Sequence, residues 1–135
     1  MQFSTAVRNA IANSVEATIG TSAVLKLYQL TGAAPANCAA SITATVLCSI
    51  TLPVDYLSAA VNGVVSKEGD WFTASALASG TADFFRLFAS DGTTCGQQGT
   101  VSGTIGGGDM TLVNPVITIG QGVIIDDYSI TAPNA

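Results

Sequence analysis

The alternation of apolar and polar positions predicts one helix followed by a series of short strands. Apolar residues recur every four positions between residues 3 and 19, at Phe3, Val7, Ile11 and Val15. This spacing is typical of an amphipathic helix, and Arg8, Asn9, Asn13 and Glu16 lie off its apolar stripe. Ser4 or Thr5 can cap its start, and Gly20 can end it. We expect this helix to pack on its own sheet; the alternative is an arm that packs on a partner.

Period-two alternation marks the strands that follow. The clearest case runs from Ile42 to Leu52, and Pro53 ends it because proline has no backbone donor. Residues 22–30 also alternate and predict a strand. Residues 31–37 predict an exposed loop, since glycine and proline there forbid regular pairing. Cys48 falls on the apolar face of the strand that ends at Leu52, so we expect a buried thiol.

The middle of the chain predicts shorter elements. Residues 55–61 predict one or two helical turns, and Asn62-Gly63 predicts a tight turn. Val64–Ser66 and Trp71–Leu77 flank a polar segment and predict a hairpin. We interpret Trp71 as a core anchor, because an indole buries a large area, and not as a platform for a ligand.

The stretch from Gly80 to Leu112 predicts two antiparallel strands joined at Asp91-Gly92. Its first strand, FFRLF, has apolar residues on both faces, which predicts a position in the core or at a subunit seam. Arg86 lies among these aromatics and would need Asp83 or another carboxylate if buried. Gly106–Gly108 predicts a turn at the end of the fold, since the lysine and helix of a phosphate-binding loop are absent.

The C-terminal part predicts a further strand from Met110 and then a final hairpin. Val116–Ile119 and Val123–Thr131 would pair around a glycine-rich turn. Consecutive strand residues point to opposite faces, so Asp126 and Asp127 cannot face one substrate together unless a bulge intervenes. We interpret these two carboxylates as charges that guard an edge strand.

Composition adds a prediction of assembly. Hydrophobic residues make up 48% of the 135 residues and charged residues 10%, against roughly 25% in ordinary soluble domains. Surplus apolar surface of this kind is most simply buried against neighbours. The net charge of −5, with four cations, provides no basic patch, so we expect no direct binding of nucleic acid. With neither an apolar run long enough for a membrane span nor a secretion signal, we expect synthesis in the cytoplasm.

The side chains needed for catalysis or metal binding are sparse. The chain has no histidine and no CxxC pair, so we expect neither a zinc site nor a nucleophilic active site, and no cofactor. Glu68 and Asp70 flank one turn but form no informative pair. Cys38 and Cys95 both lie in or beside loops, where they could form a disulfide or stay reduced. We do not expect an enzyme.

Several segments resemble a family of short virion proteins of tailed bacteriophages: SAVLKLYQLTGAAPANCAA, LPVDYLSAA, GTADFFRLFASDGTTCGQQGTV, GGGDMTLVN and the terminal ITAPNA. The family includes proteins that resemble capsid cement or decoration proteins. The resemblance implies a mainly β chain: an antiparallel, jelly-roll-like β-sandwich at residues 21–135 and a helix or arm at residues 1–20. It also favours the disulfide, because Cys38 and Cys95 match positions that the family tends to fill with cysteine.

The same resemblance implies a function without chemistry. The protein would bind the phage major capsid protein as a homodimer or homotrimer and would be found in the virion, assembled in the host cytoplasm. The candidate interface residues lie on the helix and on two apolar segments: Phe3, Val7, Ile11, Val15, Tyr56, Phe84, Arg86 and Phe88. The alternative is a tail or surface module that binds host carbohydrate through Trp71 and Tyr56.

Overall fold

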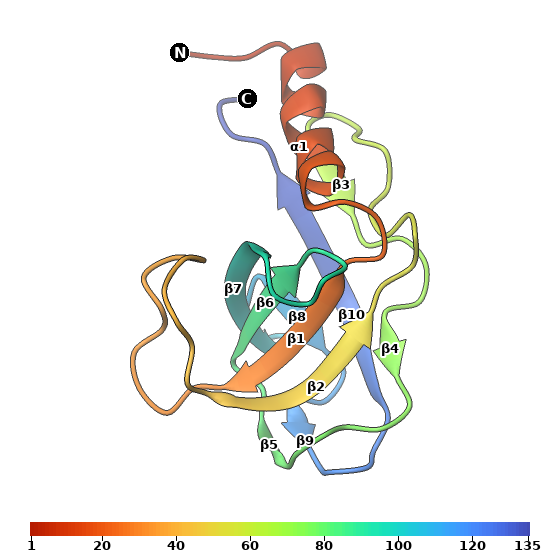
Figure 1. Ribbon diagram of the computed structural model, residues 1–135. Coiled ribbons are helices and arrows are strands. Elements are labelled where there is room, and N and C mark those ends of the chain that lie inside the picture. Colours follow the sequence, from red (N-terminus) through yellow and green to blue (C-terminus); the bar gives the residue numbers. More distant parts are fainter.

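A computed structural model describes residues 1–135 and contains one helix and ten strands (Figure 1). The elements are α1 (Thr5–Ile19), β1 (Val24–Gln29), β2 (Thr45–Thr51), β3 (Val64–Ser66), β4 (Phe72–Thr73), β5 (Gly80–Thr81), β6 (Phe84–Phe88), β7 (Cys95–Gly103), β8 (Met110–Leu112), β9 (Val116–Ile117) and β10 (Val123–Thr131). The chain is therefore mainly β with one N-terminal helix, as its pattern predicts.

The helix begins and ends where the sequence predicts. The Ser4 Oγ accepts a hydrogen bond from the Val7 N–H at 3.3 Å, and Gly20 ends the helix with a φ of 94°. α1 stands at one end of the sheet, beside β3 and the C-terminal end of β10 (Figure 1). Ile11, Val15 and Ile19 pack against the core, so the helix rests on its own sheet.

Eight strands form one curled sheet in the order β2-β1-β6-β7-β8-β10-β3, with β4 also paired to β10. β5 and β9 form a separate two-stranded sheet. The large sheet nearly closes on itself, because β4 lies against β2 and the N–H groups of Leu77 and Ala78 donate to the Leu47 carbonyl oxygen. The expectation of a wholly antiparallel fold is wrong, because the sheet is mixed: β7 and β8 are parallel, whereas the other pairs are antiparallel.

The glycine-rich segment is a tight crossover between these parallel strands. Only residues 104–109 join β7 to β8, although parallel neighbours usually need a dozen or more residues between them. Gly107 has a φ of 75°, and a Cβ on Gly108 would lie 2.8 Å from the Ser102 nitrogen. The Asp109 Oδ2 accepts hydrogen bonds from the N–H and hydroxyl of Thr100, both at 2.9 Å. The glycines therefore permit a close approach of the backbone to β7.

An aromatic cluster fills the centre of the curled sheet. The ring centroid of Trp71 lies 5.3 Å from that of Tyr128 and 6.2 Å from that of Tyr56, and Phe85 meets Tyr128 edge-on at 5.9 Å. Trp71 is fully buried, and its indole N–H donates to the Glu68 carbonyl oxygen at 3.1 Å. Its interpretation as a core anchor is confirmed.

The strand predicted at residues 42–52 is shorter than expected and contains a bulge. β2 begins only at Thr45, and its register with β1 shifts between Leu27 and Tyr28. The extra residue is Leu47, which is buried although simple alternation places it on the polar face. Cys48 is buried as expected.

Three further predictions of local pairing are wrong. β3 and β4 do not form a hairpin, since both pair with β10. β9 pairs with β5, so it forms no hairpin with β10. Residues 55–61 contain no helical turn and instead make isolated bridges, Leu57 with Lys67 and Val61 with Val64. The Asn62-Gly63 turn is confirmed, because both residues have positive φ values of 52° and 79°.

Candidate functional site

The outer face of β4, β10 and β8 carries a row of exposed apolar side chains, which we call the outer apolar row: Phe72, Ile124 and Val113. Their exposed fractions are 53%, 60% and 69%. Phe72 and Ile124 are partners in the β4–β10 register, and Val113 directly follows β8. Their neighbours Trp71, Ile125 and Leu112 point inward and are buried. Strand alternation therefore forces these three side chains outward.

Two hollows flank this row. One, of about 260 Å³, is lined by Phe72 and Ile124 together with Lys67, Asp70 and Trp71. The other, of about 240 Å³, is lined by Val113, Asn114, Gln121, Gly122, Val123 and Ile124. Ile124 borders both hollows, so it lies at the middle of the row.

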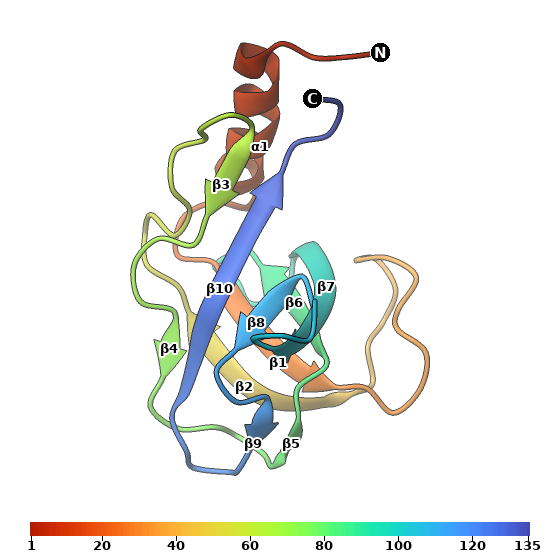
Figure 2. The ribbon, with the colours of Figure 1, turned by 180° about the vertical axis from the view of Figure 1, so that it is seen from behind.

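More apolar side chains lie on the adjoining segments. Eleven large apolar residues are exposed, and six of them fall within residues 72–77 and 113–124. Three of these six form the outer apolar row, and the other three are Leu77, Val116 and Ile119. The two segments are neighbours, because the Gly120 N–H donates to the Ala76 carbonyl at 2.9 Å. Figure 2 shows β10 crossing the molecule between β4 and β8, with β5 and β9 at the end remote from α1.

Carboxylates border the row. Asp70 lines the first hollow, and Asp126 and Asp127 follow Ile124 along β10; all three are exposed. The register between β10 and β8 shifts between Ile125 and Asp127, and this bulge leaves both consecutive aspartates exposed. The interpretation of an edge strand is wrong, because β10 has partners on both sides. We call Asp70, Asp126 and Asp127 the acidic margin.

Arg86 holds the loop between β1 and β2. The guanidinium is only 4% exposed and donates from Nη2 to the carbonyl oxygens of Ala40 at 2.7 Å and Asn37 at 3.1 Å. It also donates to the Gln98 Oε1, at 3.2 Å from Nε and 3.1 Å from Nη2. The expected carboxylate partner is wrong: these acceptors are all neutral, and Asp83 instead accepts from the Leu30 N–H. Arg86 thus fastens the loop of residues 30–44, which we call the latched loop.

A disulfide fastens the same loop. Cys38 and Cys95 are joined, with their Cα atoms 5.5 Å apart and a separation of 57 positions in the sequence. The Gln98 amide adds a hydrogen bond to the Pro35 carbonyl oxygen at 2.8 Å. Cys48 is the remaining free thiol, and burial raises its pKa to about 11. The loop is thus fixed by one covalent bond and several hydrogen bonds.

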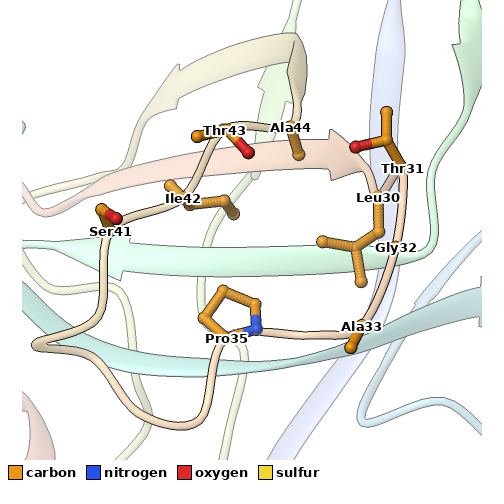
Figure 3. Close-up of a pocket in the computed structure, with 9 residues that line it drawn as sticks. All are labelled: Leu30, Thr31, Gly32, Ala33, Pro35, Ser41, Ile42, Thr43 and Ala44. Carbon is orange, nitrogen blue, oxygen red and sulfur yellow. The ribbon is translucent and has the colours of Figure 1, made fainter.

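The loop also encloses a small hollow of about 150 Å³, lined by Leu30, Thr31, Gly32, Ala33, Pro35, Ser41, Ile42, Thr43 and Ala44. Figure 3 shows Leu30, Pro35 and Ile42 pointing toward its centre. No ionisable side chain lines it. It therefore offers no group for acid–base chemistry.

Polar side chains on α1 bind the backbone of residues 56–63. The side-chain oxygens of Asn9, Asn13 and Glu16 accept from the N–H groups of Gly63, Ala60 and Tyr56, at 2.7, 2.9 and 2.9 Å. Burial is the main cause that raises the pKa of Glu16, and the nearby Asp55 raises it further. The polar stripe of α1 therefore contacts residues 56–63 and is not simply exposed to solvent.

The predicted interface residues are not gathered on one surface. Tyr56, Phe84, Arg86 and Phe88 are buried within a single chain. The latter three lie on the face of β6 nearest the latched loop, with Tyr28 beside Phe84 and the Lys26 ammonium 5.0 Å from the Phe88 ring centroid. On α1, Val7 is exposed, Phe3 is half-buried, and Ile11 and Val15 pack against the core.

Sequence reasoning missed the outer apolar row, although a signal for it exists. Pairs of consecutive apolar residues, Trp71-Phe72 and Ile124-Ile125, place one side chain on each face of a strand. A strand with one apolar face would expose polar residues instead. The doubled pattern therefore predicts large apolar side chains on the outer face as well as in the core.

The chain matches no protein-family model, no curated protein and no solved structure. None of its helices has the length and apolar character needed to cross a membrane. No group of three or more His, Cys, Asp or Glu side chains is placed to hold a metal ion.

Proposed function

We propose that this protein is a structural component of a tailed-bacteriophage particle, a capsid cement or decoration protein that binds and stabilises the lattice of the major capsid protein. The observation that carries the proposal is the outer apolar row, three large apolar side chains exposed side by side on well-ordered strands. The virion assignment itself comes from the sequence resemblance.

Burial of the outer apolar row against a partner would be energetically favourable. Apolar surface contributes roughly 25 cal/mol per Å² when it leaves water, and contiguous exposed patches are typical of interaction sites. The outer apolar row contributes nothing to the interior, which Trp71, Ile125 and Leu112 already fill from the same strands. A contact repeated around a symmetric particle would use this surface many times.

The latched loop fits the same role. Arg86 and the disulfide hold a long segment in one conformation against β6 and β7. A surface that is ordered before binding loses less conformational entropy on association. We include in the proposal a jelly-roll-like sandwich as the finer description of the curled sheet, and a homodimer or homotrimer as the bound form.

The alternative, a tail or surface module that binds host carbohydrate, depends on exposed aromatic rings. Trp71 and Tyr56 are both 0% exposed and form part of the central aromatic cluster. They therefore present no face on which a sugar could stack.

The test is to prepare particles of the encoding phage with and without the gene for this protein. Mass spectrometry of purified wild-type particles should detect the protein in a fixed ratio to the major capsid protein. Particles without it should release DNA at a lower temperature, and added purified protein should restore the release temperature. Equal thermal stability of the two particles, or absence of the protein from wild-type particles, would contradict the proposal.

A further inference from the structure

The cations of this chain are few, and each one has an internal partner. Arg8 donates to the Ala132 carbonyl oxygen at 3.1 Å, and Arg86 is buried beneath its loop. Lys26 donates to the Gly92 carbonyl oxygen at 3.1 Å and lies over the Phe88 ring. Lys67 donates to the Gly69 carbonyl oxygen at 2.9 Å and lies within the acidic margin itself. Each of the four side-chain cations thus has a hydrogen-bond acceptor within the chain.

The charge beside the outer apolar row is mainly negative. Three exposed carboxylates, at Asp70, Asp126 and Asp127, stand beside it with only the Lys67 ammonium for balance. An assembly of two copies would also combine like charges, since each whole chain has a net charge of −5. Like charges at an interface oppose association.

We propose that the outer apolar row binds a different protein, one that presents an apolar patch with Lys or Arg side chains beside it, and not a second copy of this chain. The inference rests on the proposed function and names the chemistry of the partner surface. Phe72, Ile124 and Val113 meet the apolar patch of that partner. Asp126 and Asp127 meet its cations, which speed association and fix the orientation of the two surfaces.

The experiment uses particles of the encoding phage assembled without this protein, and the purified full-length chain with its disulfide intact. Binding is measured by co-sedimentation at salt concentrations from about 0.05 M to about 0.5 M, a range over which exposed charges become strongly screened. The apolar variant is Ile124→Ser, with Val61→Ser as its matched control, because Val61 is 67% exposed beside the α1 end of the fold. The charge variant is Asp126→Asn with Asp127→Asn, and Asp55→Asn is its control.

We expect Ile124→Ser to weaken binding about tenfold or more, as for a central interface residue. The double Asp→Asn variant should weaken binding at low salt by about three- to tenfold and should show a flatter salt dependence than the wild type. The two controls should stay within about twofold of the wild type, as is usual for residues outside an interface. Circular dichroism and thermal melts of each variant separate lost binding from lost folding.

The outcomes distinguish this inference from the proposed function. If the wild type binds but Ile124→Ser binds equally well, the outer apolar row is not the contact, while the decoration function stands. Binding that is independent of salt and of Asp126 and Asp127 overturns the basic partner surface. A dimer in sedimentation velocity that Ile124→Ser dissociates shows that a second copy occupies the face. Failure of the wild type to bind the particles overturns both proposals.

Discussion

Phe72 and Ile124 lie opposite each other in the β4–β10 pairing, and both side chains are more than half exposed. Each has an inward-facing neighbour, Trp71 or Ile125, that already fills the core. The exposed pair therefore adds little to the interior of the fold. The residues that form the core are therefore distinct from those that cover the outer face.

The double variant Phe72→Ser with Ile124→Ser should unfold with a free energy about 1 kcal/mol or less below that of the wild type, because a cross-strand pair contributes only that much. Urea denaturation followed by tryptophan fluorescence measures this change. The matched control is Ile125→Ala, next to Ile124 but 1% exposed, which should cost about 2–5 kcal/mol as a core truncation. Equal losses in the two variants would show that the exposed pair belongs to the core.

Replacement of Arg86 by Met should destabilise the protein by about 2–4 kcal/mol, because several part-buried hydrogen bonds to the guanidinium are lost at once. Their acceptors are the carbonyl oxygens of Ala40 and Asn37 and the amide oxygen of Gln98. Limited proteolysis should then cut residues 31–44 faster. Arg86→Lys keeps the charge but not the planar fork, so it should restore only part of the stability. Unchanged unfolding in Arg86→Met would contradict the latch.

The pair of substitutions Cys38→Ser and Cys95→Ser should lower the unfolding free energy by up to about 4 kcal/mol, the loop-closure value for a bond that spans 57 residues. Thiol titration of the wild type should find no reactive thiol in the native protein and one, Cys48, after unfolding in denaturant. Three titratable thiols in the unfolded, non-reduced protein would show that the bond is absent.

Glu16 should make stability depend on pH in an unusual direction. Its pKa in the folded protein is raised, chiefly by burial and also by Asp55, so the folded state holds the proton more tightly than the unfolded chain. Its contribution is fully present below the unfolded pKa of about 4.3 and is lost as the pH rises through the folded pKa. Glu16→Gln keeps an acceptor for the Tyr56 N–H without the charge.

Thermal melts of Glu16→Gln and wild type from about pH 4 to about pH 7 test this relationship. The difference in melting temperature should shift in favour of Glu16→Gln as the pH rises. Asn13→Asp is a useful comparison, because it adds a charge at the neighbouring contact of α1, where the Asn13 side chain accepts from the Ala60 N–H. A variant that loses stability relative to the wild type as the pH rises would show that the carboxylate charge is favourable.

The local elements of this fold could be predicted because local rules determine them. The helix bounds follow from Ser4, Gly20 and the four-residue spacing, and the Asn62-Gly63 turn follows from the positive φ values that these residues tolerate. Trp71 is buried, as expected of an indole, because its large apolar area gains much from leaving water. These features depend on a few neighbouring residues.

Long-range pairing could not be predicted in the same way. β3 and β4 are joined by a short polar segment that resembles a hairpin loop, yet both pair with β10, more than 50 residues later in the sequence. Alternation alone also cannot locate a bulge, so Leu47 and Asp127 lie where simple counting does not place them. The partners of Arg86 could not be predicted, because two of them are backbone carbonyls, which every loop contains.

The most direct measurement for the central claim is a density map of the assembled phage particle at a resolution that shows side chains. We predict that the protein will be found on the capsid shell with Phe72, Ile124 and Val113 buried against a capsid subunit, and with a basic residue of that subunit next to Asp126 or Asp127. A map in which this face is open to solvent, while α1 or the latched loop makes the contact, would contradict the claim.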